Sequence, residues 1–90
     1  MRAVDAKRAL RRCIDDGLVN TPWTHAFDKM RKRNLDIMDI ENVLRAGIAG
    51  EAEWENGEWR YQVRTAAIVV VVQFEEDDSV TPVTAWRVKK

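Results

Sequence analysis

The chain has 90 residues, of which 46% are hydrophobic, and its formal net charge at neutral pH is zero. This length predicts a single small domain covering residues 1–90, and the hydrophobic share is too high for a disordered chain. The zero net charge excludes the overall positive field that is typical of many nucleic-acid-binding proteins.

The first predicted element is a helix over residues 2–16. Its apolar residues recur at helical spacing, while its basic residues fall mainly on other faces. Gly17 follows as a natural C-terminal stop.

Cys13 belongs to the apolar stripe of this helix, so we expect it to be a small buried hydrophobic residue. As the only cysteine it excludes an intrachain disulfide, and since no apolar leader follows Met1 we expect a cytoplasmic protein.

A second helix is predicted over residues 21–33. It has two candidate N-caps, Thr21 followed by Pro22, or Thr24. Asn34 can end this helix in a left-handed conformation.

A third helix is predicted over residues 36–46. Asp36 is its expected N-cap, and Asp39 stands three residues later as a variant of the capping box. Gly47 is the residue expected just past its end.

Residues 48–64 predict a β-hairpin, because Asn56-Gly57 is a strong signal for a two-residue turn. This turn sets the register of the pairs, which are Glu55 with Glu58, Trp54 with Trp59, Glu53 with Arg60 and Ala52 with Tyr61. Alternation then places Trp59, Tyr61 and Val63 on one face of the second strand, and Arg60, Gln62 and Arg64 on the other.

Five consecutive β-branched residues, Ile68 to Val72, predict the central strand of the sheet. Successive side chains of a strand point to opposite faces, so both faces of this strand need to be covered or paired. Five residues are too few to cross a membrane, which takes roughly 20.

An acidic loop over residues 75–78 and a last strand over residues 80–88 complete the chain. The loop lacks the spacing of a calcium site and is expected to be a solvated turn. Pro82 near the start of the last strand favours an edge position. The predicted fold is α+β, with about three N-terminal helices packed on a four-stranded antiparallel sheet.

Common catalytic and metal-binding motifs are absent, so neither a cofactor nor a metal is expected. The charges are nevertheless uneven: residues 1–33 carry nine Lys and Arg against four acids, and residues 34–59 carry one against seven. The remaining candidates are basic and aromatic, a combination suited to RNA, where arginine neutralises phosphate and rings stack on unpaired bases. They include His25, Arg31, Lys32, Arg33, Arg60, Tyr61, Arg64, Trp86 and Arg87.

The run from His25 to Leu35, followed by Asp36 and by Val43-Leu44-Arg45-Ala46-Gly47, resembles the DUF4258 family. The resemblance covers about residues 24–88 and continues through Trp59-Arg60-Tyr61, the valine-rich strand and Trp86-Arg87. The leading helix is similar to the helical start of MqsR-type toxins. DUF4258 is similar in architecture to the RelE/ParE toxin superfamily, so the resemblance implies a RelE-like fold.

The superfamily role would make this chain a toxin of a toxin–antitoxin pair that cleaves RNA without a metal, with RNA and a cognate antitoxin as partners. Arg33 or Arg64 would then hold the phosphate, Tyr61 or His25 would transfer protons, and Arg87 would stabilise developing charge.

Four of these residues also have a structural alternative: His25 can cap or pack, Arg33 can pair with Asp36 or Asp39, Tyr61 can pack in the core, and Arg87 can simply be exposed. The alternative function is a non-enzymatic interaction module, such as a homodimer, that uses the apolar sheet face. A membrane partner is not expected.

Overall fold

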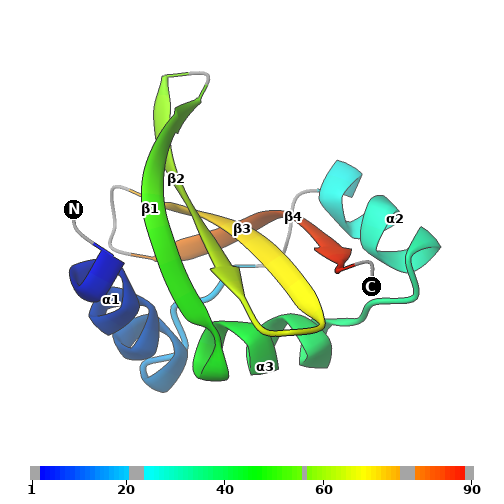
Figure 1. Ribbon diagram of the computed structural model, residues 1–90, viewed down its shortest axis with the longest axis horizontal. Coiled ribbons are helices and arrows are strands. Elements are labelled where there is room, and N and C mark those ends of the chain that lie inside the picture. Colours follow the sequence, from blue (N-terminus) through cyan, green and yellow to red (C-terminus); the bar gives the residue numbers. More distant parts are fainter. Residues whose placement is uncertain (1–2, 21–23, 56, 76–78, 89–90) are drawn as a thin grey trace.

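The computed structural model describes residues 3–20, 24–55, 57–75 and 79–88, without the side chains of residues 3–4, 24–27, 51, 55 and 58. Three helices precede a four-stranded antiparallel meander of order β1-β2-β3-β4, which confirms the α+β prediction (Figure 1). The elements are α1 (Ala3–Asp15), α2 (Thr24–Lys32), α3 (Ile37–Ala46), β1 (Ile48–Glu55), β2 (Glu58–Arg64), β3 (Ile68–Phe74) and β4 (Val80–Arg87).

The valine-rich strand β3 lies inside the sheet, between β2 and β4, as the sequence predicted. None of its four valines, Val69 to Val72, is more than 9% exposed. Val70 and Val72 belong to the main hydrophobic core, while Val69 and Val71 are buried on the opposite face of the sheet. Both faces of β3 are therefore covered.

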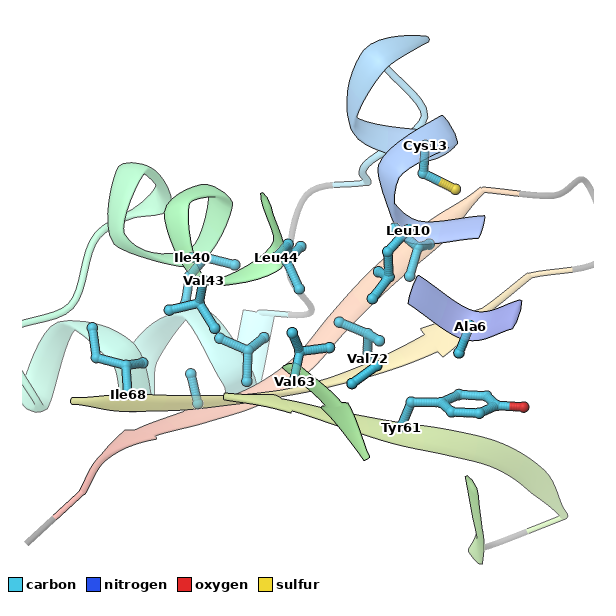
Figure 2. Close-up of a cluster of buried hydrophobic side chains, with 14 of the residues drawn as sticks. Ala6, Leu10, Cys13, Ile40, Val43, Leu44, Tyr61, Val63, Ile68 and Val72 are labelled. Carbon is cyan, nitrogen blue, oxygen red and sulfur yellow. The ribbon is translucent and has the colours of Figure 1, made fainter. Parts of the chain in front are cut away.

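Helices α1 and α3 cover one face of the sheet and bury the main core against it (Figure 2). Ala6, Leu10 and Cys13 of α1 are buried there, which confirms the expected role of the cysteine. Lys7 joins the two helices by donating its Nζ to the Leu44 and Arg45 carbonyl oxygens, at 3.2 and 3.1 Å. Among the described residues, no helix is long and apolar enough to cross a bilayer.

The hairpin of β1 and β2 has the predicted register in all four pairs, from Glu55 opposite Glu58 to Ala52 opposite Tyr61. The indoles of Trp54 and Trp59 meet edge to face with ring centroids 5.0 Å apart. A register shift between Ala49 and Ala52, a β-bulge, was not predicted. Figure 1 shows the far ends of β1 and β2 projecting away from the helices.

The predicted stops after α1 and α2 and the predicted start of α3 are confirmed. Asp36 and Asp39 form a reciprocal capping box, with N···O distances of 2.9 and 3.0 Å, at the start of α3. Gly17 and Asn34 both have positive φ, at 71° and 61°. The candidate cap at residues 21–22 lies outside the described residues, as do residues 76–78 of the acidic loop.

One contact at the outer side of β4 was not predicted from the sequence. The segment after α1 runs beside β4, where Val19 forms a parallel bridge with Val80. The Asn20 Nδ2 donates to the hydroxyls of Ser79 and Thr81, at 2.8 and 3.0 Å. These contacts attach the α1–α2 connection to the outer side of the last strand.

Replacing Gly47 by alanine should lower the free energy of unfolding by about 1–3 kcal/mol, because the site has no room for a methyl group. An added Cβ would lie 2.5 Å from the Val43 carbonyl oxygen and 2.9 Å from that of Arg64, where α3 passes into β1. Urea unfolding monitored by tryptophan fluorescence measures this change. Gly50→Ala is the matched control, since its added Cβ would meet nothing closer than 3.5 Å; equal losses for both variants would contradict this explanation.

Candidate functional site: an arginine-lined cleft

A cleft of about 980 Å³ opens on the sheet face opposite α1 and α3, near the ends of β2 and β4. Three of the predicted site residues line it: Arg33, Arg64 and Arg87. They come from three separate parts of the chain and are brought together only by the fold. The remaining lining residues are Gln62, Thr65, Ala66, Val69, Trp86 and Val88.

The floor of this cleft is a row of residues across three neighbouring strands. Arg64 pairs with Val69, and Val69 pairs with Trp86. Neighbouring strands lie about 4.8 Å apart, so the backbones of Arg64 and Trp86 are about 10 Å apart across Val69. An exposed guanidinium and a partly buried indole thus flank a buried apolar side chain.

The end of α2 fixes the position of Arg33. Leu35 N–H donates to the Met30 carbonyl at 2.9 Å and Asn34 N–H donates to that of Arg31 at 3.1 Å, which is the hydrogen-bond pattern of a Schellman motif. Asn34 supplies the left-handed residue of this motif, and Met30 and Leu35 are both buried in the core. Arg33 therefore leaves the helix in a defined direction and donates its Nη1 to the Ala85 carbonyl oxygen at 2.7 Å.

Arg87 makes the reciprocal contact from β4 to α2. Its Nε and Nη2 donate to the carbonyl oxygens of Arg33 and Asn34, at 3.3 and 2.9 Å. These carbonyls lie at the C-terminal end of the helix, where a cation is favourable. Arg87 is thus engaged in holding the end of α2 and acts on the cleft mainly by positioning Arg33.

Arg64 differs from the other two arginines. It is exposed, and its guanidinium makes no hydrogen bond to the described residues. The described residues that line the cleft include three cationic side chains and no carboxylate. Like charges that lie together without an acid favour an anionic ligand, and arginine binds phosphate or carboxylate oxygens with two parallel hydrogen bonds.

Tyr61 does not reach this cleft. It is 3% exposed, belongs to the main core, and meets Phe74 edge to face at a centroid distance of 5.5 Å. Figure 2 shows it on the same side of the sheet as Val63, below α1. Burial raises the pKa of the Tyr61 hydroxyl, so even less of it is ionised at neutral pH. The packing alternative for Tyr61 is the one that the structure bears out.

His25 lies in the first turn of α2, but its side chain is outside the described residues. Of the alternatives for Arg33, pairing with Asp36 or Asp39 is not observed: these two aspartates bond each other's backbone N–H groups instead. Among the described residues that line the cleft there is no His, Lys, Tyr, Asp or Glu.

Sequence reasoning named Trp86 and the arginines but not Gln62. The signal for Gln62 was present, since strand alternation places it on the same face of β2 as Arg64. No three His, Cys, Asp or Glu side chains among the described residues lie together as metal ligands would.

A family model described as "Domain of unknown function (DUF4258)" matches residues 24–87. The match includes α2, the entire sheet and all three arginines of the cleft, and it begins after α1. No curated protein and no solved structure matches the chain.

Replacing Arg87 by alanine should lower the free energy of unfolding by about 1–2 kcal/mol, because two charge-assisted hydrogen bonds to the end of α2 are lost. Arg64→Ala removes the same charge from the same cleft and should cost less than about 0.5 kcal/mol. Urea unfolding of the two variants compares them directly. A loss for Arg64→Ala as large as that for Arg87→Ala would contradict the assigned difference in roles.

Proposed function

The chain belongs to the DUF4258 family, and from the chemistry of its cleft we propose that it is a RelE-like toxin of a toxin–antitoxin pair that binds RNA and cleaves it without a metal. The observation that carries this proposal is the arginine-lined cleft on the sheet face opposite α1 and α3, which has no carboxylate among the described residues that line it.

RNA is the anion that this cleft suits best, because the lining offers both kinds of contact that a single strand needs. Arg64 has its donors available to phosphate oxygens, and the partly buried indole of Trp86 offers a surface on which an unpaired base can stack. Val69 between them supplies an apolar floor for the sugar and base.

Cleavage would proceed by attack of a ribose 2′-hydroxyl on the adjacent phosphorus. The P–O5′ bond breaks, a base takes the 2′ proton, and the departing 5′ oxygen receives a proton. Arg33 and Arg64 would stabilise the charge that develops on the phosphoryl oxygens. With Tyr61 buried on the other face, His25 is the remaining proton carrier among the residues proposed from the sequence.

The partners that follow are RNA and a cognate antitoxin, in the cytoplasm. An antitoxin would inhibit the protein by covering the cleft with acidic side chains, in competition with RNA. A small antitoxin-like reading frame beside the gene would support this pairing.

The alternative function is a non-enzymatic interaction module that pairs with a second copy. The valine-rich strand does not provide its surface, since its valines are buried. The exposed tryptophans of the hairpin favour this alternative instead, and self-association can also coexist with RNA binding.

Arg64→Ala should weaken binding of single-stranded RNA roughly 10- to 100-fold, because a charge-assisted contact to phosphate is lost. The slope of log affinity against log salt should also fall by about 0.7. Fluorescence anisotropy with a labelled oligoribonucleotide measures both quantities. The matched control is Arg12→Ala, which removes an equal charge from the exposed side of α1, away from the cleft; equal weakening by the two variants would contradict a localised site.

Purified protein should cleave single-stranded RNA in the presence of EDTA, alone or with ribosomes, and His25→Ala should abolish the cleavage. Tyr61→Phe should leave it within a few fold, because the ring lies in the core and not in the cleft. Gel analysis of labelled RNA gives the rates. No cleavage by the intact protein under either condition would overturn the enzymatic part of the proposal, while RNA binding would still stand on the anisotropy experiment.

A further inference from the structure

Two glutamine side chains lie on the sheet face that carries the cleft, and they differ in what they contact. Gln73 of β3 is buried, and its amide accepts from the Arg60 Nε and donates to the Glu75 Oε1, both at 3.4 Å. Gln62 of β2 is half-buried and lines the cleft, and its amide makes no hydrogen bond to the described residues. Gln62 therefore offers a ligand in the cleft both hydrogen-bond donors and an acceptor.

The strand register places Gln62 beside the apolar floor of the cleft. Arg64 is paired with Val69. Gln62 is paired with Val71, two residues further along β3, which makes Gln62 the diagonal neighbour of Val69. Diagonal neighbours are about 7–8 Å apart, a distance that a long side chain can span. Trp86 adjoins Val69 from the other side, on β4. A base lying over Val69 against the indole would thus turn an edge toward the Gln62 amide.

The amide of Gln62 is suited to a base rather than to a phosphate. Its carbonyl oxygen repels phosphate oxygens, for which the cleft already has arginines. In a single strand the edges of the bases are free to be read. A glutamine amide makes two hydrogen bonds to adenine, donating to N7 and accepting from N6. Guanine has acceptors at both corresponding atoms, O6 and N7, and would leave the amide carbonyl unpaired.

We infer that Gln62 is a specificity-determining residue of the cleft and that it selects adenine in single-stranded RNA. The inference rests on the proposed function, since it takes RNA as the ligand. Arg64 would hold the phosphate and Trp86 would stack the base, and any nucleotide can make these two contacts. Gln62 would add the contact that distinguishes one base from another, and a two-bond pair of this kind changes affinity by about 5- to 100-fold.

Fluorescence anisotropy with short labelled RNAs, made of uridine except for one central base, tests this inference. The RNA with a central adenine should bind the intact protein at least about 5-fold more tightly than the RNA with a central guanine. Gln62→Met keeps the length of the side chain and removes the amide, so it should reduce this ratio to less than about 2-fold. The affinity for the all-uridine RNA should stay within about 2-fold, which also shows that the variant is folded.

Gln62→Glu is a second variant that separates the amide from the rest of the side chain. A carboxylate has no donor for N7, so the adenine RNA should no longer be the tightest ligand, and the added negative charge should weaken all the RNAs. Asn42→Ala is the matched control, because it removes an exposed amide from α3 and should leave the adenine-to-guanine ratio unchanged.

The outcomes separate this inference from the proposed function. RNA binding by the intact protein without a preference for adenine would overturn the inference alone. A preference that survives Gln62→Met, or an equal loss of affinity for every RNA in that variant, would do the same. No binding of any RNA by the intact protein would overturn the inference together with the proposed function.

Discussion

The structure depends on one constraint, the burial of β3 on both of its faces. A strand of consecutive β-branched residues sends apolar side chains to both sides, so a single layer of helices cannot satisfy it. Helices α1 and α3 take Val70 and Val72 into the main core. Val69 and Val71 then make the opposite face apolar at its centre, and polar side chains on the neighbouring strands surround this centre. The cleft is a consequence of that arrangement, since its floor is part of β3.

The contacts that hold the fold together near the cleft are also those that shape it. The end of α2 and the end of β4 are joined by Arg33, which donates to a strand carbonyl, and by Arg87, which donates to helix carbonyls. Each guanidinium is oriented by backbone acceptors, and no carboxylate of the described residues contacts either one. A site built in this way keeps cations at fixed positions before any ligand arrives, which reduces the entropy lost on binding.

Local features of the fold could be predicted from the sequence because each depends on residues close together in the chain. The turn at Asn56-Gly57 set the register of the hairpin, and Asp36 with Asp39 marked the start of α3. The approach of Arg33 to Arg87 could not be predicted, because it depends on how α2 packs against β4, more than 50 residues later. Tyr61 is a different case. The alternation of β2 already placed Tyr61 on the face opposite Arg64, so the two side chains could be expected not to share one site.

The β-bulge between Ala49 and Ala52 lies on β1, a strand at the margin of the sheet. The segment around Val19 lines the outer side of β4, whereas β1 forms the other margin of the sheet. Bulges and charged residues on a marginal strand discourage the addition of strands from other molecules. Here the bulge interrupts the regular ladder, and the sequence of β1 adds glutamates at positions 51, 53 and 55. The strand that the sheet leaves at this margin is therefore a poor template for pairing with a strand of another molecule.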